Sequence, residues 1–178
     1  MLILAGHVIN CYIMKTIENG FIRISADEET GAVVGFTDKA SGWDIIGNKK
    51  LAKGIRLLVP CDKSRNNQVL SENQKLTSVK TGKDVMSLVW DKLYGTKSGE
   101  LDISCTLTIR LKGAEAHFIV SINNQSRFVV EEVWTPYLGG VKKKQEDAKL
   151  ELKTINMCAG WENVNLTESF SQAGYWGI

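Results

Sequence analysis

The chain has 178 residues, 43% of them hydrophobic, which suits one globular domain with a sizeable core. Its formal net charge of +2 is too small to argue for nucleic acid, and the one basic run, residues 142–144, lies beside acidic residues as in a solvated loop. Four cysteines lie far apart without a C-x-x-C pair, and there are only two histidines. We therefore expect reduced thiols, no metal site and no cofactor.

The amino-terminal residues are apolar but do not form a convincing export signal. They lack a basic start, and no small-residue cleavage site follows them. We interpret residues 1–15 as an uncertain leader or an extra edge strand, with Met14 as an alternative start, and residues 16–178 as one domain. This interpretation favours a cytoplasmic protein over an exported one, without a membrane partner.

The first third of the chain predicts a hairpin followed by shorter strands. The two hairpin strands are separated by a polar turn that ends in Gly31, a residue able to adopt positive φ. Pro60 ends a later apolar run, and residues 62–67 are polar enough for an exposed loop. The strands predicted here cover residues 21–24, 32–36, 43–46 and 55–59.

Longer strands follow from residue 76 onward. The alternation is strictest over residues 101–112, where every second residue from Leu101 to Leu111 is apolar and the others are polar. One face of this strand should be buried and the other exposed to solvent, with Cys105 on the buried face. The strands predicted here cover residues 76–80, 85–93, 101–112, 116–123, 128–138 and 150–155.

No segment shows a convincing amphipathic helix of three turns. About ten strands without helices imply two packed layers, because a single open sheet would leave its apolar rows in water. The sequence therefore predicts an all-β fold, a two-sheet antiparallel β-sandwich.

Two stretches resemble known protein families. The run E-N-G-F-I-R-I at residues 18–24, followed by D at 27, T-G at 30–31 and G-F-T-D-K-A-S-G at 35–42, resembles the opening of β-sandwich domains in many glycoside hydrolases, including alpha-mannosidases. The segments I-N-N at 122–124, V-V-E-E-V-W-T-P at 129–136 and L-G-G at 138–140 resemble part of the amino-terminal domains of bacterial glycosidase-like proteins. Both resemblances imply a galactose-mutarotase-like supersandwich.

In those families the sandwich usually precedes a catalytic (β/α)₈ barrel. The resemblance thus implies a non-catalytic domain or subunit of a carbohydrate-active enzyme of glycoside hydrolase type, which shapes a sugar cleft and packs on a barrel. A stand-alone carbohydrate-binding module and a mutarotase-type sugar epimerase remain alternatives. Expected partners are carbohydrate, the barrel domain or subunit, and a second copy of the chain.

No catalytic residues are expected within the chain. Glu131 and Glu132 are neighbours on a predicted strand and should point to opposite faces, so they do not form the carboxylate pair of a glycosidase. His117 lies on the face of its strand opposite the core row, and a plain exposed or inter-sheet histidine is expected.

Aromatic residues offer the better candidate contacts, because sugar C–H faces stack on aromatic rings. We expect carbohydrate contacts at Trp134, Tyr137, Trp161 and Glu162, with Trp161 and Glu162 in a loop. Tyr175 and Trp176 are expected to lie at an interface, because two large aromatic side chains near the end of the sequence need cover.

Overall fold

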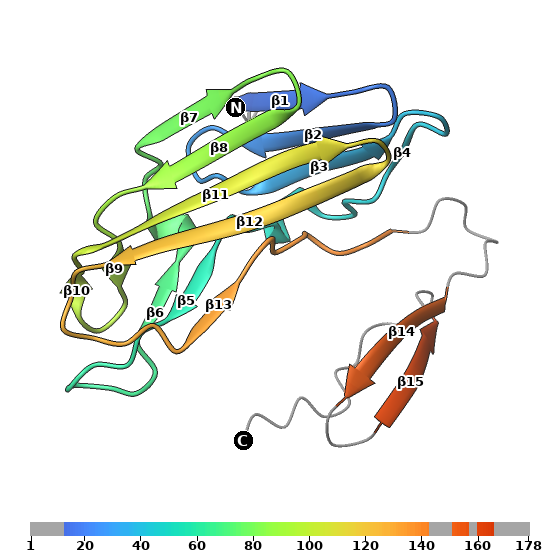
Figure 1. Cartoon of the computed structure of the whole chain (residues 1–178). Coiled ribbons are helices and arrows are strands. Elements are labelled where there is room, and N and C mark those ends of the chain that lie inside the picture. Colours follow the sequence, from blue (N-terminus) through green and yellow to red (C-terminus); the bar gives the residue numbers. More distant parts are fainter. Residues whose placement is uncertain (1–12, 143–150, 157–159, 166–178) are drawn as a thin grey trace, which may run out of the picture.

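The computed structural model describes residues 13–142, 151–156 and 160–165, the last two segments by their backbone alone. It consists of antiparallel β-strands and two short 3₁₀ turns, and the described residues include no α-helix (Figure 1). The prediction of an all-β antiparallel sandwich is confirmed.

Three sheets make up the main body. The long sheet has the order β12 (Glu115–Asn124), β11 (Ile103–Lys112), β8 (Val85–Trp90) and β7 (Ser78–Thr81). The opening sheet has the order β1 (Met14–Glu18), β2 (Ile22–Asp27), β3 (Val33–Asp38) and β4 (Trp43–Asp44). The short-stranded sheet has the order β10 (Gly99–Glu100), β9 (Tyr94–Gly95), β6 (Gln68–Leu70), β5 (Arg56–Leu58) and β13 (Glu132–Trp134).

The remaining elements are small. Two 3₁₀ turns, η1 (Lys49–Leu51) and η2 (Ser71–Asn73), connect strands of the main body. A separate hairpin is formed by β14 (Glu151–Asn156) and β15 (Gly160–Asn165), which pair only with each other.

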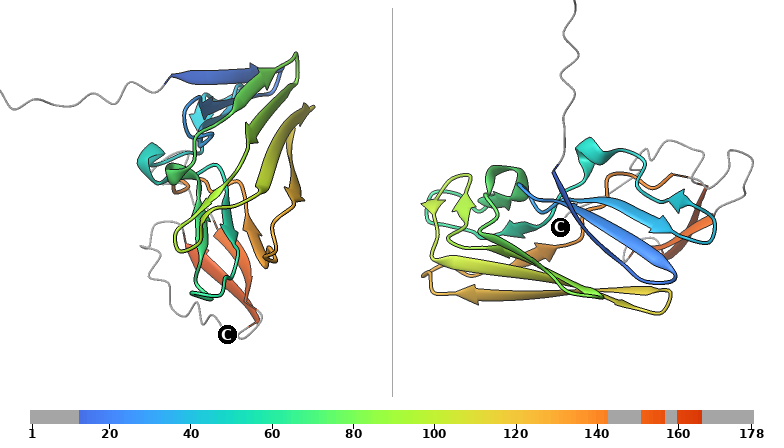
Figure 2. Two further views of the ribbon diagram at one scale, coloured as in Figure 1. Left: turned by 90° about the vertical axis from the view of Figure 1, so that its left-hand side faces the viewer. Right: turned by 90° about the horizontal axis from the view of Figure 1, so that it is seen from above.

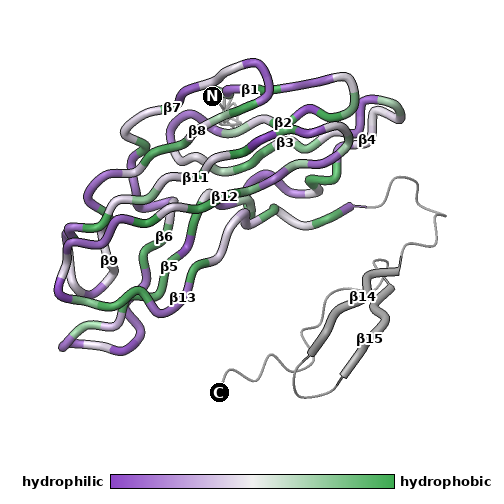
Figure 3. Tube along the Cα trace, in the orientation of Figure 1, coloured by the Kyte–Doolittle hydropathy of each residue, from purple (hydrophilic) through white to green (hydrophobic). Residues whose placement is uncertain are grey.

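The long sheet forms one layer, and the opening and short-stranded sheets lie opposite it (Figure 2). One hydrophobic core cluster contains residues from all three sheets, so the three sheets close on a common interior. Along one side, β1 lies beside β7 and β8. Hydrophobic and hydrophilic residues are mixed along each strand, as expected where one face is buried (Figure 3).

Strand β11 forms the centre of this core. It pairs with β12 over its full length and with β8 on its other side. Alternate residues from Ile103 to Leu111 are buried, as the sequence predicts. Burial raises the pKa of the Cys105 thiol to about 12, because the thiolate would lose its hydration there.

The segment before β13 differs from the sequence-based expectation. A strand over residues 128–138 was predicted, but regular pairing is confined to Glu132–Trp134. The Asn124 side chain bonds the first residue of this stretch: its Nδ2 donates to Phe128 O at 2.7 Å, and its Oδ1 accepts from Ser126 N at 2.9 Å. Such local bonds favour a turn over a strand.

The predicted exposed loop at residues 62–67 is also wrong at its end, because Asn67 is completely buried. Its Nδ2 donates to Val59 O at 2.8 Å, and its Oδ1 accepts from Lys97 N and Ser98 N at 2.8 and 3.2 Å. The polar side chain therefore joins the connection between β5 and β6 to the turn between β9 and β10, beside β6, a strand that the sequence pattern did not predict.

Two glycines allow the backbone to close on Trp90, which is fully buried. A Cβ atom at Gly31, where φ is +72°, would overlap the indole ring and lie 2.9 Å from its Cη2. A Cβ atom at Gly54 would lie 2.8 Å from the Cζ2 atom of the same ring. The indole thus fixes the distance between the β2–β3 turn and the approach to β5.

Candidate functional site

The outward face of the short-stranded sheet carries the first candidate site. Trp134 on β13 pairs in register with Arg56 on β5. The neighbouring pair, Val133 and Leu57, projects to the other side, and Leu57 is fully buried in the core. Because successive side chains of a strand alternate between faces, Trp134 and Arg56 share the outward face.

Planar side chains form a connected group on this face. The Arg56 Cζ atom lies 4.9 Å from the centroid of the Trp134 ring, within the range of a cation–π contact. Arg56 Nη2 donates to Gln68 Oε1 at 2.8 Å, and Gln68 Nε2 donates to Asn66 Oδ1 at 2.7 Å. Each of the four side chains is thereby held in a defined orientation.

Tyr94 extends this group on the next strand. Val69 on β6 pairs with Gly95 on β9, so the preceding residue of β9, Tyr94, lies opposite Leu70 and its ring is 55% exposed. We call the surface of Arg56, Gln68, Tyr94 and Trp134 the Trp134 face. It presents aromatic rings beside amide and guanidinium groups, and it suits a ligand with an apolar face and several hydroxyl groups.

The other predicted contact residues lie elsewhere. Tyr137 is 44% exposed, and its backbone pairs with Lys53, whose N donates to Tyr137 O at 2.8 Å. Trp161 and Glu162 were predicted in a loop, but they belong to β15, where they pair with Ile155 and Thr154. For Trp161 and Glu162 the structure describes the backbone alone, and Tyr175 and Trp176 lie outside the described residues.

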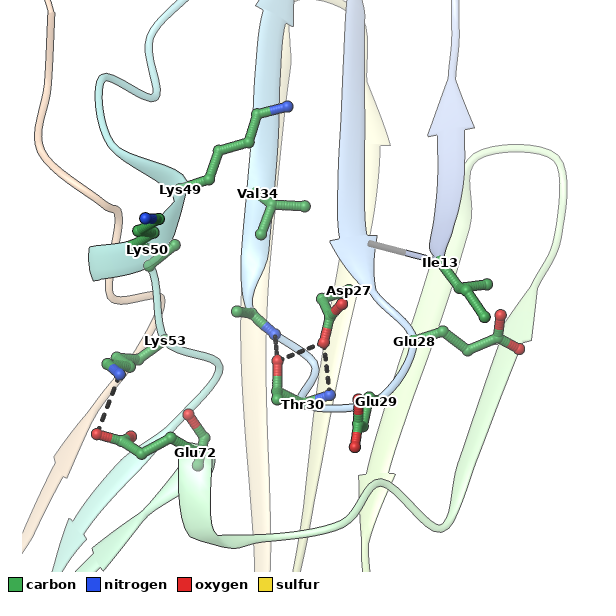
Figure 4. Close-up of a pocket in the computed structure, with 13 residues that line it drawn as sticks. Ile13, Asp27, Glu28, Glu29, Thr30, Val34, Lys49, Lys50, Lys53 and Glu72 are labelled. Atoms are coloured by element: carbon green, nitrogen blue, oxygen red, sulfur yellow. Dashed lines mark hydrogen bonds and ion pairs between the residues drawn. The ribbon is translucent and has the colours of Figure 1, made fainter. Parts of the chain in front are cut away.

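A pocket of about 610 Å³ is the second candidate site (Figure 4). Its apolar part includes Ala32, Val34 and Ala52, which form a small cluster separate from the main core. The β2–β3 turn contributes one wall, and residues of η1 and η2 contribute the others. Lys49 extends away from η1 and ends above Val34 in this view, whereas Lys53 turns towards Glu72.

Most charges in this pocket have partners. Lys53 Nζ lies 3.0 Å from Glu72 Oε1, and Lys15 Nζ lies 3.4 Å from Glu28 Oε1 at the rim. The buried Asp27 accepts hydrogen bonds at Oδ1 from Thr30 N at 2.8 Å and from Thr30 Oγ1 at 2.6 Å, which closes the turn. Paired charges of both signs suit a neutral polar ligand better than a strongly charged one.

No family model and no curated protein matches this chain. The geometry of the described residues therefore carries the functional argument. No helix within the described residues is long and apolar enough to cross a membrane.

Residues considered for catalysis do not assemble. Glu131 Oε2 lies 3.3 Å from Arg65 Nη2, and Glu132 is an exposed residue of β13. His117 Nε2 lies 2.8 Å from Glu115 Oε2 on the exposed face of β12, and neither residue lines the pocket. Within the described part of the chain, no group of three metal-ligating side chains was found.

The sequence indicated only part of these sites. The sequence indicates Trp134 as one of several aromatic residues, with Tyr137, near Pro136, but Arg56 and Gln68 come from strands far from it in the sequence. Arg56 has an advance signal, because it lies between the apolar Ile55 and Leu57, whereas Gln68 follows the polar Asn67 and has none. The pocket residues carry no motif that could have revealed them.

Proposed function

We propose that this chain is a non-catalytic β-sandwich domain of a carbohydrate-active enzyme, which contacts sugar through the Trp134 face. The observation that carries the proposal is the Trp134–Arg56–Gln68 group on the outward face of three adjacent strands. An indole ring can stack on the C–H face of a sugar, while guanidinium and amide groups bond its hydroxyls. The resemblance of residues 18–140 to sandwich domains of glycosidases supports the same class.

The surrounding strands make this face a rigid platform. The β5 and β6 residues that alternate with Arg56 and Gln68, namely Leu57 and Val69, are fully buried in the core. Because Arg56 is already stacked and hydrogen bonded, it would lose little side-chain entropy when a sugar binds. The face therefore has its binding geometry before the ligand arrives.

In this proposal, catalysis belongs to a (β/α)₈ barrel in a longer protein or a separate subunit. Exposed apolar residues lie before and after Trp134 in the sequence and would need cover from such a partner. Val129, Val133 and Val141 are 70%, 42% and 43% exposed. Burial of residues of this kind contributes roughly 25 cal/mol for each Å² removed from water, so they favour association with another domain.

Calorimetric titration of the purified chain with a panel of soluble oligosaccharides tests the sugar contact. We expect saturable binding that weakens by about 30-fold or more in Trp134→Ala, since loss of a central aromatic contact typically costs about 2 kcal/mol. Phe21→Ala is the matched control, because Phe21 is a 56% exposed aromatic residue in the connection between β1 and β2.

Two outcomes would contradict the Trp134 face as the site. Binding that survives Trp134→Ala but is lost in Lys50→Ala would place the sugar in the pocket. Absence of binding across the panel by the folded chain would remove the sugar contact altogether. Tight binding by the chain alone would favour a carbohydrate-binding module that needs no catalytic partner.

A further inference from the structure

Strand β12 is a long edge strand that pairs with β11 alone among the described strands. Figures 1 and 2 show it as the outermost strand of the long sheet. With 10 residues, it is far longer than β13, the edge strand of the short-stranded sheet, which has 3. Its outer edge therefore offers an extended row of backbone donors and acceptors.

Two hydrogen bonds establish which backbone groups face outward. Leu111 N donates to Asp84 O, so the backbone N–H and C=O groups of odd-numbered residues in β11 point towards β8. Gln125 N donates to Asp102 O across the β11–β12 pair. Because these groups alternate in direction along a strand, the backbone N–H and C=O groups of odd-numbered residues in β12 point towards β11. The even-numbered residues, including Phe118 and Val120, consequently present their N–H and C=O groups at the open edge.

This edge lacks the features that normally prevent strands from pairing. Proteins protect exposed edges with lysine, proline, β-bulges or short strands. Strand β12 contains no lysine, arginine or proline, and its register with β11 is continuous. Its only carboxylate, that of Glu115, lies at the first position of the strand.

The side chains of β12 also remain incompletely covered. Phe118, Val120 and Ile122 point towards the core but are only half-buried, whereas Leu107, which pairs with Val120, is fully buried. On the outer face, Ile119 is 50% exposed. An additional strand beside β12 would cover both the core-facing residues and Ile119 on the outer face.

We propose that a second copy of this chain occupies this edge, with the two β12 strands antiparallel about a two-fold axis beside Ile119. The two long sheets would then form one continuous eight-stranded sheet. A two-fold interface must be self-complementary, and this register meets that condition. Glu115 would face Asn123 of the partner subunit and His117 would face Ser121 of the partner subunit, so like charges do not meet.

The register also explains why the central residue is apolar. The outward backbone groups of Phe118 would bond those of Val120 of the partner subunit. Ile119 would occupy a non-hydrogen-bonded position opposite Ile119 of the partner subunit, where Cα atoms approach to about 4.5 Å. The exposed isoleucine thus becomes the centre of the contact.

Disulfide trapping tests this register directly. We would introduce Ile119→Cys into the full chain after replacing Cys11, Cys61 and Cys158 with serine, leaving the buried Cys105 in place. A separation of about 4.5 Å lies within the Cα range of disulfides, so oxidation should give a covalent dimer at least about ten-fold faster than Phe21→Cys gives one. Cross-linking no faster than in the Phe21→Cys control would overturn the proposal.

Sedimentation equilibrium provides the second measurement. We expect the unmodified chain to form a dimer as its concentration rises, and Ile119→Lys to remain monomeric because two ammonium groups would face each other across the axis. Ile119 is exposed in the single chain, so this change should leave the fold intact and, at concentrations where the unmodified chain is monomeric, the thermal midpoint as well. A chain that stays monomeric, or self-association that Ile119→Lys leaves unchanged, would refute pairing through β12.

Discussion

Replacing Gly31 by alanine should strongly destabilise the fold, because this position combines a left-handed backbone with a close contact. Its φ of +72° costs alanine about 1–2 kcal/mol. The added Cβ would overlap the Trp90 ring and lie 3.0 Å from Leu76 Cδ1, and such overpacking typically costs about 1–3 kcal/mol. The free energy of unfolding should fall by about 2–5 kcal/mol in total, a large share of the usual 5–15 kcal/mol.

Gly42→Ala separates the two contributions. Gly42 has a similar φ of +69°, but no atom lies within 4 Å of an added Cβ. It should therefore lose only the backbone part, about 1–2 kcal/mol. Urea denaturation followed by tryptophan fluorescence measures both variants. If Gly31→Ala were no less stable than Gly42→Ala, the indole would not be wedged against the β2–β3 turn, and the reasoning would be refuted.

Two further outcomes follow from buried groups. Asn67→Ala should lower the free energy of unfolding by about 1–3 kcal/mol, because it leaves buried backbone groups unpaired. The control Asn66→Ala, at an exposed position, should change this free energy by about 0.5 kcal/mol or less. Equal effects of the two variants in urea denaturation would contradict the buried hydrogen-bond network of Asn67. Burial raises the pKa of the Cys105 thiol from 9.0 in the unfolded chain to about 12 in the folded state. The free energy of unfolding should therefore fall as pH rises above about 9, and this part of the fall should vanish in Cys105→Val. Urea denaturation at pH 7 and pH 10 that gave the same loss of unfolding free energy in both proteins would count against a desolvated thiol.

Long alternating strands were predictable from the sequence, and short ones were not. In β11 and β12, the alternation covers ten residues and reports directly which face is buried. Strands of two or three residues, such as β6 and β9, contain too few positions to show a period. Their pairing depends on neighbours that the local pattern does not contain.

Polar residues produced the clearest errors. Asn67 was assigned to an exposed loop because its neighbours are polar, yet its partners at Lys97 and Ser98 lie about 30 positions away and satisfy it in the interior. Asn124 shows a local effect instead, because its side chain bonds Ser126 N and Phe128 O and forms a turn at the start of the stretch that was expected to be a strand. Both effects depend on specific side-chain geometry.

The candidate site was partly predictable for the same reason. Trp134 is recognisable by its residue type, since large aromatic side chains often supply binding energy. The arrangement with Arg56 and Gln68 depends on the pairing of β13 with β5 and of β5 with β6, which joins segments distant in the sequence. Only the three-dimensional register reveals that these side chains form one surface.

The most direct test of the proposed sugar contact follows the indole N–H signals by NMR. The chain contains five tryptophans, and Trp134→Phe assigns the signal of interest. During titration with an oligosaccharide that binds, the Trp134 signal should shift, while those of the buried Trp90 and of Trp43 on the opening sheet should stay in place. Saturable binding that leaves the Trp134 signal unmoved would contradict the account.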